Sequence, residues 1–338
     1  MDLKTIFKPN KHWFYEHGKV NFLLALNGNR LVGRLVALNN DDLLPHHKQD
    51  TANFFLFESI EDKAVADGLF EKAISWAKQH GAKRIYGPKG MTPMDGLGLL
   101  IRGFDRRPAF GMPYNPDYYA KFIEEIGFNL VREIESGYIK AKTFHIPEKI
   151  LKAADIIQKR KGLRVMQLKT RNDLNKAVKV LGESYNAALA GTEGNLPITE
   201  NDLQTMTRGL LWIAQPELIK IIMKEDTAVG FILAYPDISS ALQVTKGQLF
   251  PFGWLALLWE KHHTEWMNIN GIGIIEDYRG MAGPALLFAE LYKSVKRSKQ
   301  FHHVEVVQIG MDNARMRNEL SNMGIDFYKS HGLYESIL

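Results

Sequence analysis

The feature that most constrains the fold is a short apolar run that meets a glycine-bearing turn and then an amphipathic helix, within residues 272–296. Residues 272–275 are typical of a strand, and the turn is Arg279-Gly280-Met281-Ala282-Gly283. Backbone N–H groups in the first turn of a helix have no intrahelical partner and carry partial positive charge, which suits a phosphate. Many α/β folds also turn a corner in this way, so the segment alone leaves a cofactor site and a plain corner open.

Length and composition indicate an ordinary globular protein of about two domains. The chain has 338 residues, 45% of them hydrophobic and 24% charged. The net charge of +5 is too small to indicate a nucleic-acid partner, although it suits an anionic cofactor. The absence of cysteine excludes disulfides, thiolate metal sites and cysteine nucleophiles. The three histidine pairs are adjacent residues without acidic partners at ligand spacing, so we expect no metal site.

The sequence contains no targeting or membrane-spanning signal. The first residues, MDLKTIFKPNKHWF, lack the apolar stretch of a signal peptide. The longest apolar run, residues 249–259, is too short to span a bilayer and is interrupted by Pro251 and Gly253. We therefore expect a cytoplasmic protein without a membrane partner, and we interpret residues 249–259 as a core helix. The other interpretation of this run is the wall of a wide pocket for a long acyl donor.

The sequence pattern of each half predicts a hairpin followed by a strand, a helix and a strand. In the first half the strands are 20–26, 31–39, 53–58 and 83–86, and the helix is 62–80. In the second half they are 163–168, 218–224, 227–235, 267–275, 304–309 and 327–334, with helices at 172–187, 284–297 and 312–323. A charged segment, 140–162, contains a short predicted helix at 147–159. We therefore predict two domains, residues 1–145 and 146–338.

The second half resembles the GNAT N-acetyltransferase superfamily. The resemblance rests on the order strand, R-G-x-A-G turn, helix and strand, and on Asn313 standing eleven residues before Gly324. The first half is similar to a second, degenerate copy of the same fold. Residues 86–119 resemble a stretch of uncharacterised bacterial tandem-GNAT proteins. The resemblance implies an α/β (α+β) protein with two tandem GNAT-like domains. Each domain has a mixed, mostly antiparallel central sheet flanked by helices, and the first domain is incomplete.

The resemblance also implies a function, which is transfer of an acyl group, usually acetyl, from CoA to a small amine. Acetyl-CoA or another acyl-CoA would be the co-substrate, without a metal. Backbone groups would bind the cofactor, and the implied residues are Ile274, Ile275, Arg279, Gly280, Met281, Ala282, Gly283 and Asn313. No catalytic side chain is identified. Glu276 or Asp277 can relay the acceptor proton, but carboxylates at a strand end are usually solvated.

Three positions depart from the family pattern and support an alternative function. Ala282 replaces a glycine of the family pattern. Pro284 has no backbone N–H and so cannot donate a hydrogen bond to a phosphate. Leu320 stands where the family often has a tyrosine that acts as general acid. Tyr328 or Tyr334 can replace that tyrosine or can simply be a core or surface residue. The alternative is a non-catalytic CoA- or ligand-binding protein on a degenerate acyltransferase fold.

The first half departs further from the family. Residues 59–61 offer no glycine and lie among carboxylates, so we expect no CoA site there. The hairpin begins by Val20, which leaves no room for the usual first strand and two helices, as if Met1 were an internal start relative to longer relatives.

A glycine- and proline-rich segment in the first half, residues 87–116, is too broken for long regular elements. Its charged residues form either an acceptor pocket or a structural lid whose arginines pair with carboxylates: Asp95, Arg102, Asp105, Arg106 and Arg107.

Overall fold

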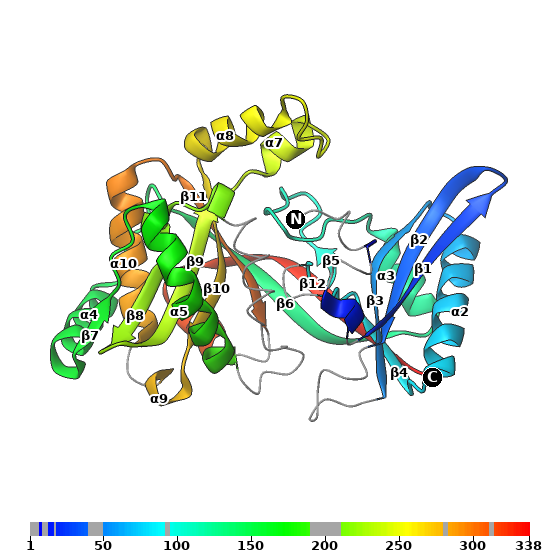
Figure 1. The fold of residues 1–338 in the computed structure, drawn as a ribbon, viewed down its shortest axis with the longest axis horizontal. Coiled ribbons are helices and arrows are strands. Elements are labelled where there is room, and N and C mark those ends of the chain that lie inside the picture. The colour runs from blue at the N-terminus through cyan, green and yellow to red at the C-terminus, as the bar shows by residue number, and fades with distance from the viewer. Residues whose placement is uncertain are drawn as a thin grey trace. The chain divides into compact units, whose positions relative to one another are not determined.

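The computed structural model describes residues 7–8, 13–16, 18–39, 50–91, 95–189, 211–279, 283–310 and 314–338. The described residues fall into two compact units. Unit 1 is drawn from Met1–Glu135, Gly310–Ala314 and Tyr328–Leu338, and unit 2 from Ser136–Ile309 and Arg315–Phe327. Two strands, β6 (Asn129–Lys140) and β12 (Asp326–Ile337), contribute residues to both units. From Tyr328 onwards, β12 therefore belongs to the unit that also holds the N-terminal elements (Figure 1).

The strands of unit 1 follow the order β1–β2–β3–β4–β12. Their bounds are Lys19–Asn27 (β1), Arg30–Asn39 (β2), Thr51–Ser59 (β3) and Arg84–Gly87 (β4). The β3–β4 pair is parallel, and the other pairs in this order are antiparallel. A short strand, β5 (Leu99–Arg102), pairs with β12. The tight turn of the β1–β2 hairpin uses Gly28 at φ 58°, a backbone conformation that glycine adopts without a steric penalty.

An aromatic core lies between the sheet of unit 1 and the helix α2 (Lys63–Gln79). The buried residues of α2 recur every three or four positions, which gives the helix one apolar face: Ala66, Leu69, Phe70, Ala73 and Ala77. Phe70 packs edge-on against rings from β3 and from the loop after α3 (Tyr118–Glu125), with centroid distances of 5.1 Å to both Phe57 and Phe128. These contacts make one continuous core in this unit.

The strands of unit 2 follow the order β11–β10–β9–β8–β7, with β6 beside β11. Their bounds are Leu163–Val165 (β7), Lys220–Lys224 (β8), Thr227–Pro236 (β9), Trp266–Ile274 (β10) and His303–Gly310 (β11). The β10–β11 pair is parallel, and β7 to β10 are antiparallel neighbours. The unit therefore has a mixed, mostly antiparallel sheet.

Helices cover this sheet and connect its strands. They are α4 (Glu148–Lys161), α5 (Arg171–Leu189), α7 (Ser239–Val244), α8 (Gly253–His263), α9 (Glu276–Arg279), α10 (Gly283–Ser298) and α11 (Ala314–Asn322). A 3-10 turn (Pro216–Leu218) precedes β8, and another (Trp13–Glu16) precedes β1. The helix α10 packs against the sheet through buried residues that include Leu286 and Leu287. No helix in the described ranges is both long and apolar enough to cross a membrane.

Most predicted elements are confirmed to within a few residues. The hairpins, the strands 53–58 and 304–309 and the helix 284–297 correspond to β1–β2, β8–β9, β3, β11 and α10. The strand predicted at 163–168 is shorter, because β7 ends at Val165. The domain boundary at residue 145 stays a prediction.

One interpretation is wrong: residues 249–259 do not form a core helix. The helix α8 begins within this run, and its large side chains face solvent, with Phe250 88% and Phe252 72% exposed. Figure 1 shows α7 and α8 as a helical hairpin that extends away from the strands of unit 2. The run is apolar in composition, but no other element of the described chain buries it. Its apolar residues are therefore available on the surface.

A buried histidine in β12 makes the stability of unit 1 depend on pH. His331 is 2% exposed; its Nε2 lies 3.0 Å from Pro113 O, and its Nδ1 has no hydrogen-bond partner among the described residues. Desolvation lowers the pKa of His331 to about 4, with the nearby Lys329 charge acting in the same direction. A histidine with a lowered folded pKa contributes stability above its unfolded pKa, and that stability is lost as the pH falls towards the folded value.

We expect the free energy of unfolding to fall by about 2 kcal/mol between pH 7 and pH 5 because of His331. Urea unfolding of the native chain and of His331→Gln at both pH values measures this, because the variant lacks the titrating group. His262→Gln, at an exposed histidine, is the matched control and should keep the native slope. An equal pH slope in native protein and His331→Gln would contradict the prediction.

Candidate active site

The parallel strands β10 and β11 part in the middle of unit 2. They pair from Trp266↔His303 to Ile269↔Val306, and both strands continue beyond the last pair. At that point β10 contains a bulge, where Asn270 and Gly271 together face Leu233 of β9. Gly271 has φ 131°, which disfavours any other residue there. Bulges redirect backbone groups and are frequent beside active sites. The fork between β10 and β11 is therefore the first element of the candidate site.

Unit 1 repeats this arrangement. Its parallel strands β3 and β4 pair from Thr51↔Arg84 to Asn53↔Tyr86, and β3 continues to Ser59. β3 also carries a bulge, with two residues, Leu56 and Phe57, facing one residue of β2. In both units a long helix, α2 or α10, connects the two parallel strands. The two units are therefore related copies of one strand–helix–strand plan.

A buried polar cluster lies at the fork of unit 2. Asn268 of β10 is directly opposite Glu305 of β11 and Tyr235 of β9. Directly opposed residues share a face of the sheet, so these three side chains lie on one face. Asn268 and Glu305 are both 0% exposed. Buried polar side chains in the centre of a sheet are costly, so this cluster is a candidate for function.

Asp237 orients the cluster and also holds the base of α7. Its Oδ2 accepts a hydrogen bond from Asn268 Nδ2 at 2.6 Å, and its Oδ1 accepts one from the Ser239 N–H at 2.9 Å. Asn268 Oδ1 is buried and has no hydrogen-bond partner within the described residues. This buried carbonyl oxygen therefore keeps an unused hydrogen-bond acceptor site. Asp237 is best understood as a positioning residue.

The Tyr235 hydroxyl is the proton donor closest to the bulge among these groups. It accepts a hydrogen bond from Asn270 Nδ2 at 3.0 Å. The pKa of Tyr235 is raised to about 12, mainly by burial. The hydrogen bond from Asn270 opposes this shift, and the nearby carboxylates of Asp237 and Glu305 add to it. The phenol therefore keeps its proton at neutral pH. Carboxylate and phenol lie on one face beside the fork, so the arrangement can accept one proton and donate another.

An aromatic wall continues the same face towards the start of the strands. The His303 ring stacks on Trp266 at 4.5 Å, and its Nδ1 lies 2.7 Å from the Tyr138 hydroxyl. The adjacent His302 pairs instead with Glu265 at 3.0 Å. The two histidines thus take separate partners. In the described part of the chain, no group of three or more His, Asp or Glu side chains is placed to hold a metal ion.

The predicted cofactor-binding residues lie partly within the described chain. Ile274 ends β10, and the Ile275 N–H donates to Val229 O at 3.0 Å. Gly283 starts α10 and is buried, and a Cβ there would lie 3.0 Å from Ile274 Cδ1. The strand end and the helix start are therefore in close contact, as the turn requires.

The rest of the predicted turn is only partly covered. Arg279 ends α9. Gly280, Met281, Ala282 and Asn313 lie outside the described residues. Their role in cofactor binding stays a prediction.

The N-termini of the two equivalent helices differ. The first turn of α10 contains no acidic residue. In unit 1 the Asp62 side chain caps α2 and accepts a hydrogen bond from the Ala64 N–H at 3.0 Å. The hydroxyls of Tyr118 and Tyr119 also bind the Ser59 backbone at the end of β3. A carboxylate and two phenols thus lie at the equivalent position in unit 1. Their presence favours the expectation that CoA does not bind there, which stays a prediction.

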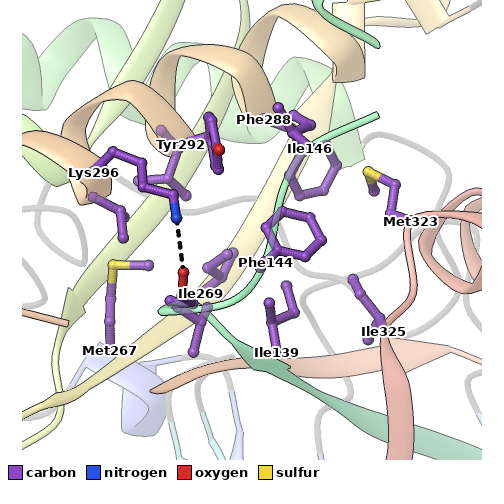
Figure 2. Close-up of a pocket in the computed structure, with 14 residues that line it drawn as sticks. Ile139, Phe144, Ile146, Met267, Ile269, Phe288, Tyr292, Lys296, Met323 and Ile325 are labelled. Carbon is purple, nitrogen blue, oxygen red and sulfur yellow. Dashed lines mark hydrogen bonds between the residues drawn. The ribbon is translucent and has the colours of Figure 1, made fainter. Parts of the chain in front are cut away.

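A small apolar pocket lies on the opposite face of the β10–β11 fork. It encloses about 50 Å³ and is lined by β10, β11, α10 and the segment after β6. Met267 and Ile269 alternate with Asn268 and so point to this face. Figure 2 shows Phe144 and Ile146 pointing into it, and the Lys296 Nζ donating to Ala141 O at 3.1 Å. Lys296 and Tyr292 are the lining residues with polar side-chain atoms, and the others are apolar.

The contacts of the remaining candidates favour a structural interpretation. Leu320 is 0% exposed in the core of unit 2, and Tyr334 is buried in unit 1 with its hydroxyl donating to Glu124. Tyr328 lies under the Arg106 guanidinium at 5.9 Å. Arg102 pairs with the buried Glu135 at 3.0 Å. These contacts favour the structural interpretation of the glycine- and proline-rich segment.

The proton relay suggested at the end of β10 receives no support from burial. Glu276 and Asp277 are both exposed to solvent. Both carboxylates lie in the first turn of α9. They are solvated there, as is usual for carboxylates at a strand end.

Sequence reasoning missed the polar cluster. The sequence does contain a signal for this cluster. Polar residues stand at alternate positions within otherwise apolar strands, in residues 267–274 (MNINGIGI) and 303–310 (HVEVVQIG). These residues stand at inward positions, where a strand would ordinarily place apolar side chains. Only the pairing register reveals that Asn268 and Glu305 are neighbours.

Known proteins resemble the chain along most of its length. No family model matches it. Protein YghO of Escherichia coli K12 is 28% identical over 323 residues, covering 92% of this chain and 80% of that protein. A bacterial ceramide synthase of Caulobacter vibrioides is 26% identical, covering 100% of this chain and 89% of the synthase.

Solved structures identify the fold. A tandem GNAT protein from the clavulanic acid biosynthesis pathway matches 95% of this chain and 83% of its own, with a TM-score of 0.53 and 10% identity. A GCN5-related N-acetyltransferase from Sphaerobacter thermophilus matches 91% and 77%, with a TM-score of 0.51 and 13% identity. The chain therefore has a tandem GNAT-type fold, and the predicted fold class is confirmed.

Proposed function

We propose, from the tandem GNAT-type fold, that this chain transfers an acyl group from a CoA thioester to an amine, with the chemistry in unit 2. The observation that carries the proposal is the buried Asn268–Glu305 pair at the fork of β10 and β11. The fold alone supports an acyltransferase-type protein. The acetyl donor expected from the sequence and the small amine acceptor are finer parts of the proposal.

The fork between β10 and β11 would bind the acyl-CoA thioester. Beyond Ile269↔Val306 the edges of two parallel strands diverge, so an extended pantetheine arm can follow β10 by backbone hydrogen bonds. The pyrophosphate would lie at the start of α10, near Arg279–Gly283. A backbone amide at the Asn270–Gly271 bulge would polarise the thioester carbonyl. Positioning and polarisation account for much of the catalysis in such a reaction.

The polar cluster would accept and donate the protons that the reaction transfers. The amine arrives mainly as an ammonium ion, which suits a face with the carboxylate of Glu305 and the free carbonyl oxygen of Asn268. Glu305 takes the proton, the amine nitrogen bonds to the thioester carbon, and the carbon–sulfur bond breaks. The thiolate of CoA then takes a proton from Tyr235 or from water, and the second proton that leaves the nitrogen restores that donor.

Binding and turnover are tested in sequence. Isothermal titration with acetyl-CoA should show binding in the micromolar to millimolar range, and release of free thiol across a panel of amines should then show transfer. No heat at millimolar acetyl-CoA or longer acyl-CoA would sink the proposal. Binding without thiol release for any amine would favour the alternative, a non-catalytic CoA-binding protein.

A second candidate is the same reaction with a fatty acyl donor and a long-chain amine. One relative is named a bacterial ceramide synthase, and a ceramide is the fatty amide of a long-chain amino alcohol. The exposed apolar side chains of α7–α8 also favour lipid substrates. Comparing acetyl-, octanoyl- and palmitoyl-CoA with small and long-chain amines in the thiol-release assay separates the candidates. Faster transfer with acetyl-CoA and a small amine would exclude the second one.

A further inference from the structure

The α7–α8 hairpin carries a dense group of exposed apolar side chains. The hairpin comprises residues 239–263, between β9 and β10. Its exposed large side chains are Val244, Leu249, Phe250, Phe252, Trp254, Leu255 and Trp259. Single exposed apolar residues are ordinary on a protein surface, but a contiguous group marks an interaction site. The hairpin therefore has a function outside the core.

The hairpin is firmly attached at its base. Lys261 of α8 is 5% exposed, and its Nζ donates to Trp212 O at 3.1 Å and to Ala214 O at 2.9 Å. Desolvation lowers the pKa of Lys261. At the other end the Asp237 carboxylate binds the start of α7. The exposed aromatic residues thus stand on an anchored support.

The charge and the residue types of the α7–α8 hairpin indicate what kind of partner it binds. From residue 239 to residue 259 the only charged side chain is Lys246, which is exposed, and there is no carboxylate. The partly buried Glu260 and the buried Lys261 follow, then the exposed His262 and His263, and the chain has a net charge of +5. Tryptophan and phenylalanine beside basic groups suit the boundary between lipid headgroups and acyl chains.

We propose that the α7–α8 hairpin docks on the surface of bilayers that contain anionic phospholipids, with Phe250, Phe252 and Trp254 inserted below the headgroups. The expectation of no membrane partner rested on the missing signal peptide and on an apolar run too short to span a bilayer. Those arguments do not address contact of exposed side chains with a membrane surface. The docking is interfacial and does not depend on acyl transfer.

The test is co-sedimentation of the full chain with vesicles of phosphatidylcholine, with and without phosphatidylglycerol. We expect binding to the anionic vesicles and quenching of tryptophan fluorescence by brominated acyl chains. The double variant Phe250→Ser/Phe252→Ser should bind at least about tenfold more weakly. Because both residues are exposed, the variant should keep the native circular dichroism spectrum.

A matched control lies in unit 1, where Leu24 and Leu26 of β1 are each 63% exposed. Leu24→Ser/Leu26→Ser should bind vesicles as the native chain does. Absence of vesicle binding by the native chain, or equal binding by the Phe250→Ser/Phe252→Ser variant, would overturn the proposal. Self-association that this variant abolishes, without vesicle binding, would assign the surface to a second copy of the chain instead.

Discussion

Replacing Glu305 with glutamine is expected to lower kcat for amine acylation by about 10²- to 10⁴-fold, the range found for loss of a general base. Glutamine has nearly the same shape as glutamate and can still face Asn268, but it cannot accept the ammonium proton. The affinity for acyl-CoA should stay unchanged, because Glu305 lies on the face of the fork proposed for the amine. Steady-state thiol release with the best amine, together with titration of acyl-CoA, measures both quantities.

Glu290 of α10 supplies the matched control for this experiment. Its carboxylate, 20% exposed, pairs with Lys293 at 2.7 Å on the surface of the same unit. Glu290→Gln should keep kcat within about twofold, because a surface ion pair contributes little. A Glu305→Gln variant with native kcat would show that another group removes the proton.

Phe70→Ala is expected to lower the free energy of unfolding of unit 1 by about 3–5 kcal/mol. Phe70 is 0% exposed and meets Phe54, Phe57 and Phe128 edge-on at 5.1 Å each. Removing the ring leaves a cavity between α2 and β3 and also removes the contacts with all three rings. Urea unfolding followed by circular dichroism should show an earlier first transition, because the two units have separate cores.

The control for this prediction is the same substitution at an exposed phenylalanine. Phe250 is 88% exposed, so Phe250→Ala should change the free energy of unfolding by less than about 0.5 kcal/mol. Similar losses for Phe70→Ala and Phe250→Ala would mean that the hairpin is buried in solution. That result would also count against the proposed membrane surface.

Local pattern was enough to predict most of the secondary structure. The period of α2 and α10 and the β1–β2 turn at Gly28 depend on residues close together in the chain. The resemblance to the tandem acyltransferase fold rested on the same local features, and solved structures confirm it. Local signals survive folding because each element must satisfy its own backbone hydrogen bonds.

The candidate site could not be predicted in this way. Asn268 and Glu305 are 37 positions apart in the printed sequence, and only the register of two parallel strands makes them neighbours. The predicted catalytic alternatives near the C-terminus, Tyr328 and Tyr334, have structural contacts instead. Register depends on bulges and on side-chain packing across the sheet, which a single strand does not encode alone.

The sequence by itself determined the strand–helix–strand order of both halves. The cofactor role of the turn before α10 and the unsuitability of residues 59–61 for a phosphate stay predictions. Local periodicity, turn chemistry and charge are sufficient for those statements. Only the tertiary structure decided that polar groups of β9, β10 and β11 meet at the fork, and that the apolar run 249–259 faces solvent. The physical reason is that apolar composition measures the gain from burial, whereas the packing of distant elements decides which side chains are buried.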